Sequence, residues 1–157
     1  MLPQKNDRAH VGSVTWQKRP INARHKARRF ALQALYQWQI TRAPVNDIEQ
    51  EFFACNDIKK FDVDYFVDIV RGVVKFHGRI DTEMQPFLDR AIDELDFVEL
   101  AALRIAIYEL LYRTDVPYKV VINEALELTK VFGSSSGFKF VNGVLDKFVS
   151  LGLPSLG

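Results

Sequence analysis

A stretch bounded by two helix-punctuating residues, Pro117 and Gly133, most constrains the fold of this chain. Proline suits the first position of a helix because its missing N–H is not needed there, and glycine readily takes the left-handed conformation that ends one. We therefore predict a helix that begins at Pro117 and is stopped by Gly133 as a left-handed cap. Its apolar residues fall within about 160° of arc at ~100° per residue. The predicted buried face consists of Tyr118, Val121, Ile122, Ala125, Leu126, Leu128, Thr129 and Phe132.

The segment before this helix is nearly all apolar from Val98 to Tyr112. Asp96 and Glu99 have the spacing of a capping box, in which each side chain bonds a free backbone N–H at the helix start. A helix that is apolar almost all round belongs at the centre of a bundle. Arg104 lies on one flank, between apolar neighbours, where it either bridges helices or faces a partner. The narrow edge expected to face solvent is marked by Glu99, Glu109 and Arg113.

The remaining segments also show helical periodicity, and no segment shows convincing strand alternation. After Asn22, a first helix has a core stripe; a short helix over 47–55 and a long one between Asp62 and Pro86 follow. A helical turn over 87–95 and a last helix after the three serines 134–136 complete the set. These patterns predict an all-α fold. The first core stripe is Ala27, Phe30, Ala31, Ala34, Leu35 and Trp38, and the last is Phe140, Val141, Val144, Leu145, Phe148 and Leu151.

The net charge of +1 conceals a marked segregation. Residues 1–30 carry eight basic side chains against Asp7 alone, a net +7, so the rest of the chain carries −6. A basic arm on a mildly acidic body is typical of proteins that bind a polyanion. The lone Cys55 and the lack of a long apolar run predict a reduced, cytoplasmic protein. The basic residues are Lys5, Arg8, Lys18, Arg19, Arg24, Lys26, Arg28 and Arg29.

The outer face of the first helix carries His25, Arg29, Leu32, Gln33, Tyr36 and Ile40. A line of Leu32, Tyr36 and Ile40 on the solvent side indicates a surface that another molecule covers. Basic residues also crowd the start of this helix, where the helix dipole is positive and disfavours them. Binding a phosphate there would relieve that conflict.

No set of residues predicts catalysis, a metal site or a cofactor. The three histidines, His10, His25 and His77, have no partner ligands at metal-binding spacing. His77 lies on an apolar stripe, which predicts a core histidine with a satisfied hydrogen bond. Cys55 has no basic neighbours and is interpreted as a packing residue.

Four ordered blocks resemble the NusB family of bacterial transcription antitermination factors. They are 27–39 (ARRFALQALYQWQ), 103–110 (LRIAIYEL), 115–125 (DVPYKVVINEA) and 139–147 (KFVNGVLDK). The resemblance implies a non-enzymatic protein with about seven helices in two small packed bundles. The expected organisation is a flexible basic tail over 1–22 and one domain over 23–151. Its N-terminal bundle would span about 23–84 and its C-terminal bundle about 87–151.

The resemblance also implies partners and site residues. The family forms a heterodimer with NusE, a small-subunit ribosomal protein, and the pair binds single-stranded boxA RNA of ribosomal RNA operons within the antitermination complex of RNA polymerase. Carried onto this chain, the family's RNA-binding residues fall on Arg24, His25, Lys26, Arg28, Arg29, Phe140 and Asn142. Phe140 also fits a core position. Its NusE-binding residues fall on Tyr36, Glu99 and Arg104, of which Glu99 also has a capping explanation.

Two other functional classes fit the same residues. A similar helical domain precedes the catalytic domain of some ribosomal RNA cytosine methyltransferases, although neither a glycine-rich cofactor turn nor a catalytic cysteine follows here. The third possibility is a helical homodimer that associates through Leu32, Tyr36 and Ile40.

Overall fold

The computed structural model describes residues 22–152, and the predicted basic tail over 1–22 therefore lies almost wholly outside the described residues. Within 22–152 the chain is all-α, as predicted, with six α-helices instead of about seven. The helices are α3 (Ala23–Thr41), α4 (Val45–Cys55), α5 (Val63–Met84), α6 (Phe97–Tyr112), α7 (Tyr118–Phe132) and α8 (Ser135–Lys147). Short helical turns join them: η1 (Ile58–Lys60), η2 (Gln85–Phe87), η3 (Ile92–Glu94) and η4 (Phe148–Gly152).

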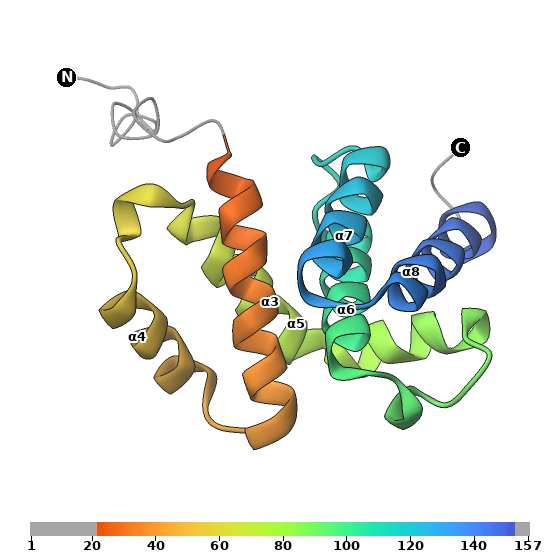
Figure 1. The fold of residues 1–157 in the computed structure, drawn as a ribbon, viewed down its shortest axis with the longest axis horizontal. Helices are drawn as coiled ribbons and strands as arrows, with labels where there is room; N and C mark the ends of the chain where they lie inside the picture. Colours follow the sequence, from red (N-terminus) through yellow and green to blue (C-terminus); the bar gives the residue numbers. More distant parts are fainter. Residues whose placement is uncertain (1–21, 153–157) are drawn as a thin grey trace.

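The six helices surround one continuous hydrophobic core. In Figure 1, α3 and α4 lie on one side and α7 and α8 on the other, with α6 running behind α7 and α5 passing behind α3. Helix α3 packs against α5, α6 and α7, so the two predicted bundles share their buried side chains. Helix α6 is central, as its apolar sequence predicts, and residues 100–110 are all buried.

The ends of the helices follow the sequence signals with two corrections. Asp96 caps α6 by accepting hydrogen bonds from the N–H groups of Val98 (2.7 Å) and Glu99 (3.2 Å). Helix α7 begins at Tyr118, one residue later than predicted, and Pro117 is the residue that precedes it. Gly133 is extended (φ −115°, ψ −162°) and not left-handed, because the chain passes directly into the Ser134 cap of α8. A side chain at Gly133 would still meet the Thr129 carbonyl oxygen at 3.0 Å.

Periodicity also misplaced several side chains. Leu32, predicted on the solvent side of α3, is buried, because α3 is enclosed by helices on more than one face. Tyr118 and Leu151, predicted in core stripes, lie at the ends of their segments and are exposed. The predicted helical turn over 87–95 is reduced to the short 3₁₀ turn η3, which follows a second such turn, η2, that ends at Phe87. Cys55, interpreted as a packing residue, is exposed.

A buried ion pair ties α3 to α6. Arg28 is 4% exposed and Glu109 1% exposed, and Arg28 Nη2 lies 2.8 Å from Glu109 Oε2. Glu109 was predicted at the solvent edge, but the edge of α6 that carries it faces α3. The Tyr65 hydroxyl donates to the same carboxylate, and Arg28 also reaches Glu124 of α7 at 3.4 Å. Burial lowers the pKa of Arg28, but hydrogen bonds and attraction from Glu109 outweigh this, so the group stays charged.

Two further arginines join helices through carboxylates. Arg104 of α6, 4% exposed, bonds both oxygens of Asp81 of α5 and donates to the side-chain oxygen of Gln39 at 3.0 Å. Arg71 of α5 binds the fully buried Glu49 of α4 through two 2.8 Å bonds. Charged groups stay buried only when they are paired in this way. These pairs therefore fix how the helices meet.

Removing one partner of the Arg28–Glu109 pair should be strongly destabilising. We expect Glu109→Gln to lower the free energy of unfolding by about 3–5 kcal/mol, because the buried charge of Arg28 would lose its closest countercharge and keep only Glu124, at 3.4 Å. Glu127→Gln is the control, since Glu127 is exposed and lies 3.5 Å from the exposed Lys130; its effect should stay within about 1 kcal/mol. Urea unfolding measures both. Equal effects would contradict a structural role for the buried pair.

Gly72 of α5 allows α6 to approach closely. A Cβ at Gly72 would lie 2.3 Å from the Tyr108 ring, whereas a Cβ at Gly78 of the same helix would meet nothing within 4 Å. We expect Gly72→Ala to lower the free energy of unfolding by about 1–3 kcal/mol through overpacking. Gly78→Ala should raise it by about 0.5–1 kcal/mol through helix propensity. Chemical denaturation of both variants tests the contrast, and a stabilised Gly72→Ala protein would refute the close packing.

Candidate functional site

The basic start of α3 divides into buried and exposed cations. Arg24 is exposed, with its guanidinium 4.3 Å from the centre of the Tyr65 ring and 3.6 Å from Asp62. His25 is partly buried, and its Nδ1 lies 2.8 Å from Oε1 of Glu124. Arg28 was predicted to contact RNA with its neighbours, but it is enclosed by Glu109, Glu124 and Tyr65. The structure therefore removes Arg28 from the exposed cations.

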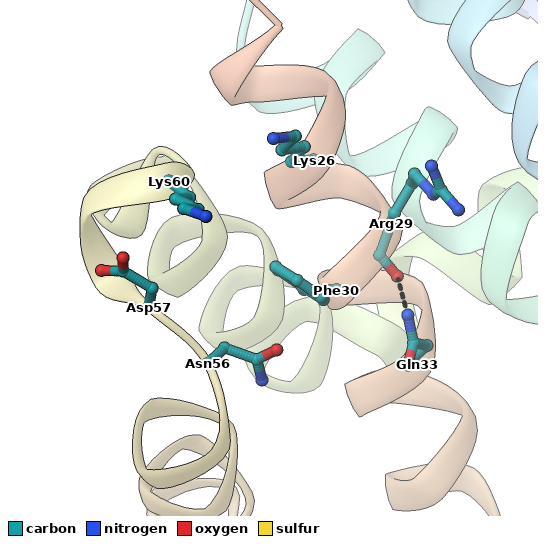
Figure 2. A pocket seen from close by; sticks show the side chains of 7 residues that line it. All are labelled: Lys26, Arg29, Phe30, Gln33, Asn56, Asp57 and Lys60. Atoms are coloured by element: carbon teal, nitrogen blue, oxygen red, sulfur yellow. Dashed lines mark hydrogen bonds between the residues drawn. The ribbon is translucent and has the colours of Figure 1, made fainter. Parts of the chain in front are cut away.

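Lys26 and Arg29 reach the surface on another flank of α3. They line a cavity of about 320 Å³ between α3 and the segment that follows α4. The Arg29 guanidinium lies 5.9 Å from the centre of the Phe132 ring of α7. Figure 2 shows the seven side chains around this cavity: Lys26, Arg29, Phe30, Gln33, Asn56, Asp57 and Lys60.

Sequence reasoning missed the half of this cavity that comes from Asn56, Asp57 and Lys60. These residues lie far from the α3 motif in sequence, and packing between Phe30 and Phe61, with ring centres 4.8 Å apart, brings the segments together. The adjacent Lys59 and Lys60 were the available signal, since two neighbouring lysines lie four and five residues after the end of a short amphipathic helix. The sequence pattern does not show that these two lysines lie close to α3 in the fold.

Phe140 and Asn142 of α8 lie apart from the start of α3. Phe140 is partly buried and packs against the core, in keeping with its position at the edge of an apolar stripe. Its ring also lies 4.5 Å from the Arg90 guanidinium. A second cavity of about 250 Å³ beside it is lined by Lys139 and Lys147. Asn142 is partly buried. Basic side chains thus surround an aromatic ring here as well, together with the carboxylate of Asp89, which lines the cavity and pairs with Arg90.

The three predicted partner residues occupy different environments. Tyr36 is 40% exposed, and its ring meets the Phe97 ring edge-on at 6.2 Å. Glu99 is partly buried, with its carboxylate against Gly137 at the start of α8. Burial and the nearby Asp96 charge raise the pKa of Glu99. Arg104 is the internal bridge to Asp81 described above, one of the two alternatives predicted for it.

An apolar hollow beside Tyr36 continues the surface of the first cavity along α3. It has a volume of about 480 Å³, and Gln33 lines both it and the cavity that holds Lys26. Ile40 is exposed one turn beyond Tyr36. The residues around the hollow are Leu32, Gln33, Tyr36, Gln37, Phe52, Val98 and Phe132. One helix thus presents cations at its start and an apolar surface along its middle.

The described residues contain no group of three histidine, cysteine or acidic side chains that could hold a metal ion. The Nδ1–H of the partly buried His77 donates to the Val74 carbonyl oxygen of its own helix at 2.8 Å, and the ring packs against Trp38, in keeping with the predicted satisfied histidine on an apolar stripe. No described helix is both long and apolar enough to cross a membrane.

Comparison with known proteins agrees with this arrangement. The "Transcription antitermination protein NusB" of Idiomarina loihiensis is 54% identical over 133 residues, which cover 85% of this chain and 96% of that protein. The protein of the same name from Pseudomonas fluorescens strain Pf0-1 is 56% identical over 124 residues, covering 79% of this chain and 75% of that protein. These relatives are antitermination factors and not enzymes.

Solved structures show the same fold. The structure of T. maritima NusB has a TM-score of 0.73 and 30% identity, covering 83% of this chain and 92% of that one. A chain from a structure described as antitermination factors NusB and NusE in complex with dsRNA has a TM-score of 0.69 and 26% identity, covering 81% and 96%. The model of the NusB family matches residues 25–150. This chain belongs to the NusB family.

Proposed function

We propose that this chain is a non-enzymatic antitermination subunit that binds boxA-type single-stranded RNA of ribosomal RNA operons together with NusE, as part of the antitermination complex of RNA polymerase. The observation that carries the proposal is the layout of α3. Exposed Arg24 and Arg29 and the partly buried Lys26 lie at its start, and the exposed ring of Tyr36 lies farther along the same helix. Single-stranded RNA and the NusE partner would thus occupy adjoining surfaces of α3.

The chemistry of the α3 start suits a nucleic acid. Three cations that reach the surface neutralise phosphates without regard to sequence, which supplies affinity. Helix α3 has no acidic residue in its first turn, and Asn22 makes no side-chain cap bond. Anionic phosphate would therefore stabilise a helix end that its own sequence leaves positive. Base recognition falls to rings and amides, or to the NusE partner.

The apolar hollow at Tyr36 suits a protein partner. Exposed aromatic rings at the rim of an apolar hollow are typical of residues that anchor protein interfaces. A related chain solved in a complex of NusB, NusE and dsRNA supports NusE as that partner. The burial of Leu32 leaves Tyr36 and Ile40 as the exposed apolar side chains on this face of α3, which narrows the surface available to a homodimer.

RNA binding is tested by fluorescence anisotropy of a labelled boxA RNA and of a scrambled RNA, with and without NusE. We expect NusE to tighten binding of boxA RNA selectively, because the partner adds base contacts to the phosphate contacts of this chain. Weak and equal binding of the two RNAs, unchanged by NusE, would refute the proposed function. That result would favour the alternative function, an accessory helical domain like the one that precedes the catalytic domain of some ribosomal RNA cytosine methyltransferases.

Charge reversal separates the start of α3 from the rest of the surface. We expect Arg24→Glu, Lys26→Glu and Arg29→Glu together to weaken binding of all RNAs alike and to flatten the salt dependence by roughly 0.7 in log–log slope per lost phosphate contact. The matched control reverses three exposed lysines elsewhere, Lys75, Lys119 and Lys130. If the two triple variants have the same slope, the start of α3 is not the phosphate-binding surface.

Tyr36→Asp tests the partner surface. Placing a carboxylate in an apolar contact should weaken the complex with NusE at least about tenfold and leave the free energy of unfolding nearly unchanged. Tyr118→Asp is the control, because Tyr118 is 38% exposed on α7, close to the 40% of Tyr36. Isothermal titration calorimetry measures affinity, and light scattering checks for homodimers. If the two variants bind NusE with equal affinity, Tyr36 is not part of the NusE-binding surface.

A further inference from the structure

The cavity between α3 and η1 has an aromatic wall as well as cations, and neutralising a phosphate requires only the cations. One wall is Phe30, a partly buried ring whose side chain projects into the space between the two segments in Figure 2. Two lysines, Lys26 from α3 and Lys60 from η1, flank that ring. At about 320 Å³ the cavity is at the lower end of the range for small-molecule sites. Its size suits one nucleotide.

The walls of this cavity are held in place by the fold. The Phe30 ring packs edge-on against Phe61 at 4.8 Å and against Phe52 at 6.1 Å. The N–H of Asp62 donates to the Ala23 carbonyl oxygen at 3.1 Å, which ties the end of the η1 segment to the start of α3. The ring therefore does not need to reorganise to accept a ligand, and preorganised sites bind with a smaller entropy loss.

The two lysines lack an anionic partner within the described residues. No ion pair involves Lys26 or Lys60 in residues 22–152, whereas Arg24 and Arg28 each have one. The acidic side chain on the lining, Asp57, accepts a hydrogen bond from the Lys59 N–H at 2.9 Å and so caps η1. The Arg29 guanidinium points away from Phe30 in Figure 2. The ammonium groups of Lys26 and Lys60 are thus the cations available to the cavity.

The side-chain amide of Asn56 provides the cavity with a hydrogen-bond acceptor that can distinguish one base from another. Its Nδ2 lies 2.9 Å from the Phe52 carbonyl oxygen, and only the NH₂ group can donate to a carbonyl. This bond fixes the amide so that Oδ1 is the free atom. A free Oδ1 accepts hydrogen bonds, so it pairs with a base that carries an exocyclic amino group, such as cytosine or adenine. Uracil has a carbonyl oxygen at the corresponding position and is disfavoured.

We propose that this cavity binds one nucleotide of single-stranded RNA, with the base against Phe30, its amino group donating to Asn56 Oδ1, and a flanking phosphate between Lys26 and Lys60. The proposal rests on the proposed function and adds a base-selective position to it. Stacking on an aromatic ring together with a backbone cation is the common way proteins hold unpaired bases. An acidic peptide would use the two lysines but would leave the ring and the free amide oxygen unused.

Neighbouring lysines of η1 provide a matched test. Lys60 lines the cavity, whereas the adjacent Lys59 is exposed and does not line it. Lys59→Glu and Lys60→Glu change the net charge equally, so long-range attraction to RNA falls equally in both. By anisotropy with a labelled boxA RNA, we expect Lys60→Glu to bind about tenfold more weakly than Lys59→Glu. Phe30→Leu, which keeps apolar bulk for the core, should weaken binding between about 5-fold and 100-fold.

Base selectivity is tested without the rest of the RNA by NMR titration of the ¹⁵N-labelled protein with CMP, UMP and inorganic phosphate. CMP should shift the Asn56 side-chain amide signals at lower concentration than UMP, and phosphate alone should leave them unmoved. Equal shifts by CMP and UMP, equal RNA affinities of the Lys59 and Lys60 variants, or tighter binding of an acidic peptide than of RNA would each overturn the proposal. If RNA binding by the unaltered protein with NusE persists in those cases, the proposed function stands without this pocket.

Discussion

The buried network around Glu109 determines how much of the basic start of α3 can serve a ligand. Glu109 accepts hydrogen bonds from Arg28 and from the Tyr65 hydroxyl, and burial and the Glu109 charge raise the pKa of Tyr65 so that it remains a donor. A buried carboxylate without these donors would be strongly unfavourable. Arg28 is therefore committed to the fold. The same residue fixes α3 against α6 and α7, and so sets the direction in which Lys26 and Arg29 project.

Helix α3 links the two candidate surfaces without a moving part. It packs on α4, α5, α6 and α7, and its contacts with the core run from Ala23 to Trp38. Gln33 lines both the cavity near Lys26 and the hollow near Tyr36, so the two surfaces adjoin at that residue. A protein partner bound at Tyr36 would add its own surface to the RNA-binding surface proposed at the start of α3. Cooperation between RNA and a protein partner then follows from adjacent contacts and does not require a conformational change.

The sequence predicted element type well and side-chain environment less well. Apolar periodicity, the predicted caps at Asp62 and Asp96 and the three serines 134–136 located the starts of these helices to within a residue or two. Periodicity gives the angle of a residue around its own helix, but burial depends on how many neighbours surround that helix. Leu32 and Glu109 were misplaced because both α3 and α6 are enclosed on more than one face. No single-helix pattern contains that information.

The candidate site shows the same limit in its charges. Arg24 and Arg28 are one turn apart on α3 and look equivalent in sequence, yet one is exposed over Tyr65 and the other is enclosed by two carboxylates. Glu109 and Glu124, which make that difference, come from segments more than 80 residues away in the chain. Lys60 of the proposed nucleotide site was missed for the converse reason, since the contact between Phe30 and Phe61 is what brings its segment beside α3. A basic motif therefore predicts the presence of a polyanion surface, while the buried partners of its members decide which cations form it.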